Sequence, residues 1–226
     1  MFRKIVLDTE TTGLKETDRI IEIGCVELID DIPSERIFHE YVNPECEVPD
    51  EVVRITGLTY DFLKDYPTFA FYADSFLEFI ADDILVIHNA KFDVGMLNTE
   101  LQRFGKQPIS LIRTIDTVQL ARKKFPGSPA SLDALAKRYN IARERHGALI
   151  DAKVLAKVYV KLIESSYQQI LDIYENNTNV ANDSKNVAFP RRFFLPNSVE
   201  LEAFNKMLSS MQPTSMWEEL DRNDGI

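Results

Sequence analysis

Two acidic residues lie two positions apart at the end of an apolar run near the N-terminus. Asp8 and Glu10 follow the residues IVL in the segment IVLDTE. Because successive side chains of a strand point to opposite faces, a strand here would place both carboxylates on one face. The two charges repel each other unless cations or hydrogen bonds compensate, and hard divalent cations such as Mg²⁺ prefer oxygen ligands of this kind. Taken alone, however, such a pair is more typical of a solvated strand end.

Three more residues that could do chemistry lie far along the chain. Asp93, in HNAKFD, falls near the start of a predicted helix, where the helix dipole favours an anion. His146 and Asp151 lie in HGALIDA, and Gly147 indicates that the histidine precedes the helix that carries the aspartate. Asp151 would then lie on or near the buried face of that helix, where an unpaired carboxylate is unfavourable. Each residue alone also has an ordinary interpretation, as a first-turn acid or a surface histidine.

Together, the four acids and the histidine predict phosphodiester chemistry. Two divalent ions held by such a cluster suit an in-line attack on a phosphodiester. One ion helps to generate hydroxide, and both stabilise charge on the attacking and leaving oxygens. An unperturbed imidazole has a pKa of about 6.5, which suits it to take a proton from the attacking water. His146 is therefore the candidate base.

An α/β fold must position these residues. Apolar runs predict strands over residues 3–8, 20–29 and 37–42, which form an antiparallel opening. Strands and helices then alternate, which predicts a mixed sheet rather than an all-parallel one. The elements expected there are a helix over 67–81, a strand over 84–87, a helix over 92–104, a strand over 111–116, and helices over 117–124, 132–139 (with Ser131 as N-cap) and 148–164.

The composition is that of a globular protein. The chain has 226 residues, 45% of them hydrophobic, which is enough for one domain of ordinary size plus a tail. It has no apolar run of 18 residues, and MFRKIVLD lacks an apolar signal region, so no membrane contact is expected. Cys25 and Cys46 make no disulfide framework, and a reducing, cytoplasmic setting is the expectation.

The net charge of −10 argues against a free-standing nucleic-acid binder, for which a basic domain is expected. Binding through phosphate neutralisation would be weak and strongly dependent on salt. Two alternatives follow: nucleic acid is not the substrate, or another molecule brings the substrate to this chain.

The composition changes after about Ser166. Residues 176–186 (NNTNVANDSKN) are polar and lack periodicity, which predicts a flexible linker. Order is expected to resume over 189–211, where NSVELEAFNKML has the pattern of an amphipathic helix. The expected organisation is a domain over 1–165, a linker over 166–188 and a partly flexible tail over 189–226.

The segments IVLDTETTGL (5–14), VIHNAKFDVG (86–95) and HGALIDA (146–152) resemble the three motifs of the DEDDh family of 3′–5′ exonucleases. Within that family, residues 3–165 are most similar to the proofreading (epsilon) subunits of bacterial DNA polymerase III. The resemblance implies a ribonuclease-H-like, mixed five-stranded sheet flanked by helices. It also implies two Mg²⁺ or Mn²⁺ ions and release of 5′-mononucleotides from a single-stranded or mispaired DNA 3′ end.

The resemblance also assigns roles by position. It implies that Asp8, Glu10 and Asp151 bind the ions directly, with Asp8 bridging both. Asp93 would act through metal-bound water, and His146 would be the general base. Further residues would contact the terminal nucleotide or line the site: Thr9, Thr11, Thr12, Gly13, Leu14, His88, Asn89 and Phe92.

Several of these contacts have alternatives. The threonines and the glycine are also ordinary turn residues, and Asn89 is equally typical of a helix N-cap. Leu14 can wedge against a base. Thr56-Gly57-Leu58 stands where some relatives have His-Gly-Ile, so Thr56 cannot supply an imidazole to the substrate contact expected there.

The tail resembles, more loosely, the segment by which epsilon subunits hold the polymerase catalytic (alpha) subunit. An amphipathic helix followed by Trp217 suits docking in a partner's groove, although the helix could instead pack on its own core. Gln168, Leu171 and Ile173 match the spacing of a sliding-clamp motif. Continuation of the preceding helix explains them equally well, and residues 212–217 are a second candidate. A theta subunit is a further partner that the resemblance suggests.

Three functions therefore compete. The first is a proofreading exonuclease tethered to a polymerase, where the tether raises the effective concentration of DNA without a basic groove. The second is an RNA-processing exoribonuclease of the same family, such as an oligoribonuclease. The third is a structural polymerase subunit with a silent site, against which the five intact positions argue.

Overall fold

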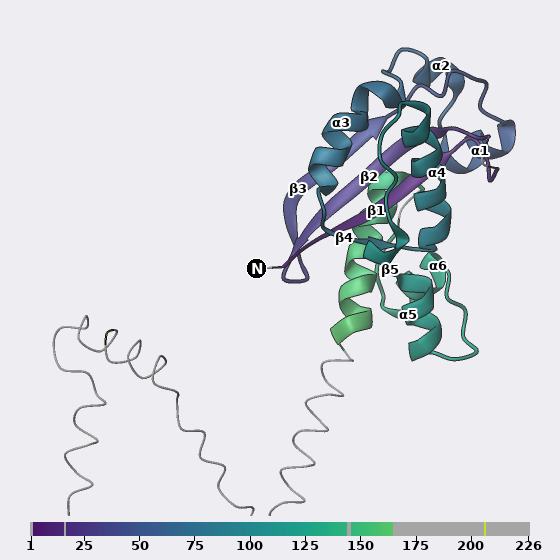
Figure 1. Ribbon diagram of the computed structural model, residues 1–226. Coiled ribbons are helices and arrows are strands. Elements are labelled where there is room, and N and C mark those ends of the chain that lie inside the picture. The colour runs from purple at the N-terminus through teal and green to yellow at the C-terminus, as the bar shows by residue number, and fades with distance from the viewer. Residues whose placement is uncertain (1, 16, 144–145, 165–205, 207–226) are drawn as a thin grey trace, which may run out of the picture. The chain divides into compact units, whose positions relative to one another are not determined.

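The computed structural model describes residues 2–15, 17–143, 146–164 and Lys206 (Figure 1). Its first three strands form the predicted antiparallel opening: β1 (Arg3–Thr11), β2 (Ile20–Ile29) and β3 (Ile32–Tyr41). Asp30 and Asp31 join β2 to β3 with positive φ angles of 50° and 66°, as in a two-residue hairpin turn. β3 therefore begins directly after the turn, earlier than predicted. The apolar pattern does not reveal this start, because the first residues of β3 are mostly polar and exposed.

Two parallel strands complete the sheet. β4 (Ile84–Ile87) pairs with β1, and β5 (Thr114–Asp116) pairs with β4. The strand order is β3-β2-β1-β4-β5, so β1 lies in the centre and is paired on both sides. The predicted mixed five-stranded sheet is confirmed.

The longer predicted helices are confirmed, and they cover both faces of the sheet (Figure 1). They are α3 (Phe69–Ile80), α4 (Ala90–Arg103), α5 (Thr117–Lys124), α6 (Leu132–Arg138) and a helix over residues 148–164, which Figure 1 draws in green. Ser131 caps α6 as predicted, because its hydroxyl accepts a hydrogen bond from the backbone N–H of Ala134. Among the described residues, no helix is both long and apolar enough to cross a membrane.

The apolar pattern of the sequence does not predict two short helices, α1 (Asp50–Thr56) and α2 (Tyr60–Leu63). Residues at their ends, rather than an apolar periodicity, mark where these helices begin or stop. Gly57 adopts the left-handed conformation that closes α1, and the hydroxyl of Thr59 accepts a hydrogen bond from the N–H of Phe62 at the start of α2.

The strand predicted over 111–116 is wrong in its first half. Leu111–Arg113 form a 3₁₀ turn, which the hydroxyl of Ser110 caps by accepting a hydrogen bond from the N–H of Ile112. Only Thr114–Asp116 pair with the sheet. An apolar run of this length does not distinguish a strand from a capped turn.

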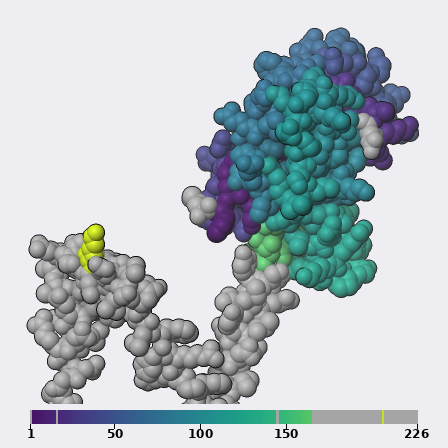
Figure 2. All heavy atoms as spheres, viewed as in Figure 1, coloured from purple at the N-terminus to yellow at the C-terminus, as the bar shows by residue number. Residues whose placement is uncertain are grey.

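The alternation of β1 supplies two separate cores. Ile5 and Leu7 pack on one face with α3 and α4. Val6 faces the opposite side, where it packs with α5, α6 and the helix over 148–164. In the space-filling view, teal atoms from the middle of the chain fill the centre of this face, and purple atoms of the N-terminal segment show only at its sides (Figure 2).

Candidate active site

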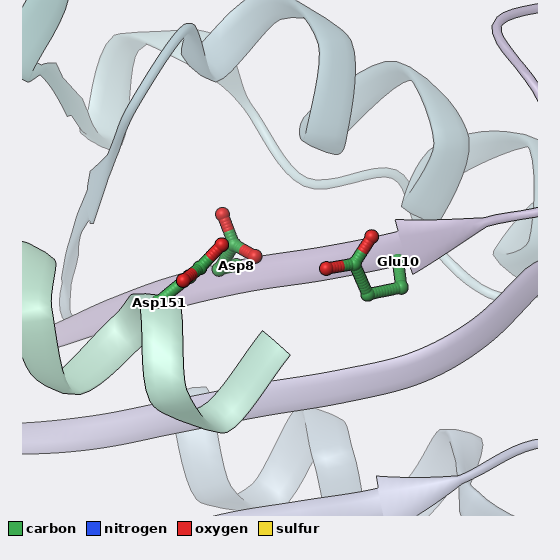
Figure 3. Close-up of side chains that lie close together, drawn as sticks. All are labelled: Asp8, Glu10 and Asp151. Carbon is green, nitrogen blue, oxygen red and sulfur yellow. The ribbon is translucent and has the colours of Figure 1, made fainter. Parts of the chain in front are cut away.

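Three of the predicted acids converge at the end of β1. Asp8 and Glu10 project from the strand, and Asp151 projects from the first turn of the helix over 148–164 (Figure 3). One carboxylate oxygen from each residue lies within 4.8 Å of the others. The prediction that strand alternation places Asp8 and Glu10 on one face is therefore correct, and that face is the one covered by the helix that carries Asp151.

A glycine allows the helix to come this close to the sheet. Gly24 of β2 is paired with Asp8 of β1. A Cβ built on Gly24 would lie 2.3 Å from the carbonyl carbon of Ala148 and 2.3 Å from the backbone nitrogen of Leu149. The first turn of the helix thus lies against bare strand backbone, directly beside the first acid.

Asp93 reaches the cluster from the other side of β1. It lies in the first turn of α4 and is buried. Its Oδ1 accepts two hydrogen bonds from Thr9, one from the backbone N–H at 3.1 Å and one from the hydroxyl at 2.8 Å. Thr9, predicted to contact the nucleotide, is therefore also the residue that fixes the position of Asp93.

The four carboxylates strain one another electrostatically. Burial raises the pKa of Asp8 well above its ordinary value, and the charges of Asp93, Asp151 and Glu10 raise it further. Burial, followed by the charges of Asp151 and Glu22, raises the pKa of Glu10 to about 7. Burial also raises the pKa of Asp93 to about 7, although the hydrogen bonds from Thr9 oppose this shift. Such a group of oxygen ligands suits divalent cations, which would relieve the repulsion.

Arg143 contacts the site, although the sequence pattern does not single it out. Its guanidinium group is largely buried and forms a two-pronged ion pair with Asp151, with Nε donating to Oδ1 over 2.8 Å and Nη2 donating to Oδ2. Nη1 donates to Asp133 on α6, and Nη2 also donates to Nδ1 of His146 over 2.8 Å. The only signal in the sequence is a pair of arginines, Arg143 and Arg145, just before the candidate histidine.

His146 lies before the helix over 148–164, as predicted. The following Gly147 has a φ of 149°, which residues other than glycine rarely adopt. A Cβ on Gly147 would lie 3.5 Å from a carboxylate oxygen of Glu22. Glu22 is itself buried and bonded to Nε2 of His39 over 2.7 Å, so a second buried acid borders the turn that carries the histidine.

A cleft of about 660 Å³ opens beside Glu10. Leu14, which is 85% exposed, projects at its edge, and α1 supplies Val52 and Ile55, which the sequence analysis did not identify. The hydroxyl of Thr56 is engaged within the protein, because it donates to the carbonyl of Val52 over 3.0 Å. The cleft gathers most of the residues predicted to contact the nucleotide: Thr9, Thr11, Thr12, Gly13, Leu14, Thr56 and Phe92.

His88 and Asn89 line a second cleft with Lys91 and Arg122, and Asn89 also lines a smaller cleft with Leu14 and Phe92. Burial lowers the pKa of His88, and its Nδ1 lies 2.9 Å from the hydroxyl of Thr117. Asn89 occupies the N-cap position of α4 with a φ of 72°. The N-cap interpretation is thus correct in position, although the Asn89 side chain makes no capping hydrogen bond within the described residues. The polymerase and clamp candidates Gln168, Leu171, Ile173 and Trp217 lie outside the described residues.

The central strand of the mixed sheet and the helix over 148–164 bring Asp8, Glu10 and Asp151 together, as the exonuclease motifs predict. Residues 5–159 match the exonuclease family RNase_T. The DNA polymerase III subunit epsilon of Rickettsia felis is 42% identical over 225 residues, covering 94% of this chain and 98% of that protein. The chain therefore belongs to the RNase_T exonuclease family, among its DNA polymerase III epsilon subunits.

Solved structures share the fold. Exonuclease X in complex with 5′ overhanging duplex DNA is 26% identical, with a TM-score of 0.59, over 72% of this chain and 92% of that chain. The nuclease domain of 3′hExo, a DEDDh family member bound to rAMP, covers the same shares at 18% identity and a TM-score of 0.62. The predicted ribonuclease-H-like fold is confirmed.

Proposed function

We propose that the chain removes mispaired nucleotides from the 3′ end of DNA by metal-dependent hydrolysis, releasing 5′-mononucleotides. The observation that carries this proposal is the convergence of Asp8, Glu10 and Asp151, whose oxygens lie within 4.8 Å of one another. Asp93 adds its charge to Asp8 from the opposite side of the strand. Three carboxylates whose oxygens approach this closely repel one another, and burying them is costly without cations.

In this proposal, Asp8, Glu10 and Asp151 would hold two divalent ions, Mg²⁺ or Mn²⁺. When bound, the ions supply an activated water and stabilise the charge that develops on the phosphate. Asp93, fixed by Thr9, orients water at the edge of the metal site. His146 accepts the proton of the attacking water once its ring nitrogen is free.

The cleft beside Glu10 receives the terminal nucleotide. Its walls combine exposed apolar groups, Leu14 and Ile55, with the polar backbone around Gly13. Leu14 wedges against the base, and Phe92 closes the side next to α4. Thr56 lines the cleft without supplying a charge, and its hydroxyl already donates to a carbonyl within α1.

DNA rather than RNA is the proposed substrate, since the relatives that span nearly the whole chain are named as subunits of a DNA polymerase. The direct test is a nuclease assay on a 3′-mispaired DNA primer and on a short RNA, in EDTA, Mg²⁺ and Mn²⁺. Faster, metal-dependent digestion of the mispaired DNA is expected. Preference for RNA would support the exoribonuclease alternative, and no digestion by the folded protein would support a silent structural subunit.

The name of these relatives also supports a place in a DNA polymerase III complex. In this proposal, residues 1–165 are the nuclease domain, 166–188 a linker, and 189–226 the tail that binds the catalytic alpha subunit in the cytoplasm. Theta and the sliding clamp are further partners, the clamp through residues 168–173 or 212–217. Attachment would offset the net charge of −10, because a tethered nuclease needs little intrinsic affinity for DNA.

The tether is tested by deletion. A chain ending at residue 165 should lose binding to the polymerase subunit in a pull-down assay and keep its nuclease rate on short single strands. Retained polymerase binding by the shortened chain would refute the assignment of the tail, without bearing on the nuclease site.

A further inference from the structure

The contact between Arg143 and His146 determines which nitrogen of the histidine carries a proton. A guanidinium group has only donors, so Nδ1 of His146 must accept the hydrogen bond that Arg143 makes over 2.8 Å. A neutral imidazole whose Nδ1 accepts carries its one N–H on Nε2. Neither nitrogen can then take a proton from water, so His146 in this arrangement cannot serve as a base.

The same guanidinium group lies at the metal site. It bonds to both carboxylate oxygens of Asp151, and its charge lowers the pKa of Asp8 and Glu10 against the stronger effect of burial. Arg143 therefore supplies one positive charge at the point where the acids repel one another. A divalent cation at these oxygens would repel the guanidinium group and compete with it for Asp151.

A second acid makes release possible without leaving the arginine unpaired. Nη1 of Arg143 also donates to Asp133, which lies in the first turn of α6 and whose side chain is 68% exposed. Asp133 lies outside the acidic cluster. If the guanidinium group leaves Asp151, this ion pair can hold it beside the site.

We infer that Arg143 is a positioning residue that acts as a latch: one guanidinium group occupies Asp151 and Nδ1 of His146 together, and cation binding releases both. This inference rests on the proposed function of the site. In this arrangement His146 becomes available as a base only when cations occupy the acidic cluster, because Asp151 and His146 share Nη2 of Arg143 as a hydrogen-bond donor.

The first test observes the protonation of His146 in the wild-type protein, and a variant serves only to assign the signals. The ¹⁵N imidazole spectrum of the full chain in EDTA should show His146 with Nδ1 unprotonated and Nε2 protonated. The chain has three histidines, so the His146 signals are assigned by their loss in His146→Asn. Addition of Mg²⁺ should shift the Nδ1 signal away from its arginine-bonded value. A protonated Nδ1 in EDTA, or a spectrum that Mg²⁺ leaves unchanged, would overturn the latch.

The second test measures competition for the acids. Arg143→Gln should bind Mn²⁺ about three- to tenfold more tightly by calorimetry, because a unit charge beside the site is removed. Arg54→Gln, at an exposed position on α1, is the matched control and should bind as the wild type does. Equal or weaker binding by a folded Arg143→Gln protein would refute competition.

Different results would contradict the latch and the proposed nuclease function. Wild-type protein that digests DNA in Mg²⁺, while Arg143→Gln shows unchanged Mn²⁺ affinity, would remove the latch and leave the nuclease assignment standing. Wild-type protein that binds Mn²⁺ and shows the expected shift of His146, but digests nothing, would contradict the proposed function.

Discussion

Gly24 and Ala148 touch through their backbones at the point where the helix that carries Asp151 crosses β2. Gly24→Ala would place a Cβ 2.3 Å from the Ala148 carbonyl carbon, and backbone atoms cannot rotate out of the way. We expect a loss of stability of about 1–3 kcal/mol from overpacking. A shift of Asp151 by about 1 Å should lower the nuclease rate about 100-fold.

The matched control for this variant is Gly95→Ala on α4, where an added Cβ meets no heavy atom within 4 Å among the described residues, apart from the backbone of its own helix and its chain neighbours. It should be neutral or should stabilise the protein by about 0.5–1 kcal/mol, since alanine favours a helix over glycine. Urea unfolding and a primer-digestion assay measure both effects. An active, stable Gly24→Ala protein would show that the helix start is not held in place by this contact.

Thr9→Val tests the support of Asp93. The substitution removes the 2.8 Å hydrogen bond from the hydroxyl and keeps the one from the backbone N–H. It should cost about 1 kcal/mol of stability, weaken metal binding and lower the nuclease rate roughly tenfold. Thr99→Val, whose hydroxyl donates to the carbonyl of Gly95 one turn earlier in α4, should change none of these. Unchanged Mn²⁺ affinity in Thr9→Val would contradict the supporting role.

The acidic cluster predicts an unusual dependence of stability on pH. Glu10 titrates near pH 7 in the folded protein and from an ordinary value of 4.5 in the unfolded chain. Between these values the folded state holds a proton that the unfolded chain has lost, so metal-free stability should fall as pH rises from about 4.5 to 7. The loss should be on the order of 2 kcal/mol.

Urea unfolding in EDTA at several pH values measures this loss. Mg²⁺ should restore stability above pH 7 by binding the ionised form, and Glu10→Gln should flatten the metal-free profile. A metal-free protein that becomes more stable over the same interval would show that the carboxylates are not strained. Asp82→Asn, at a fully exposed acid, is the matched control and should leave the profile unchanged.

Leu14→Ala tests the cleft. Because Leu14 is 85% exposed, its truncation should leave the melting temperature unchanged. Lost contact with the terminal base should lower kcat/KM roughly tenfold, mainly through KM. Ile112→Ala, at a residue that is 97% exposed and far from this cleft in the sequence, should leave both kinetic constants as they are. Unchanged kcat and KM in Leu14→Ala would show that Leu14 does not contact the terminal base.

The sequence predicts the parts of this molecule whose periodicity is strong. The bounds of β2, β4 and α5 follow from apolar runs and caps, and strand alternation alone places Asp8 beside Glu10. Two kinds of feature remain hidden from the sequence. Short α1 depends on the conformation of Gly57, and the role of Arg143 depends on a contact with Asp151 that no spacing rule produces.

β1 is paired with β2 along its length and with β4 at residues 4–7, directly before the first acid, whereas Arg143 and His146 lie outside the helices and strands. Backbone amides of a doubly paired central strand exchange with solvent chiefly through global opening, and loop segments exchange through local fluctuations. Asp8 directly follows the doubly paired residues, and both Asp8 and Glu10 remain paired with β2, so this strand is expected to open late. On warming, we expect the protein to lose the ordered placement of its base well before the two strand carboxylates separate.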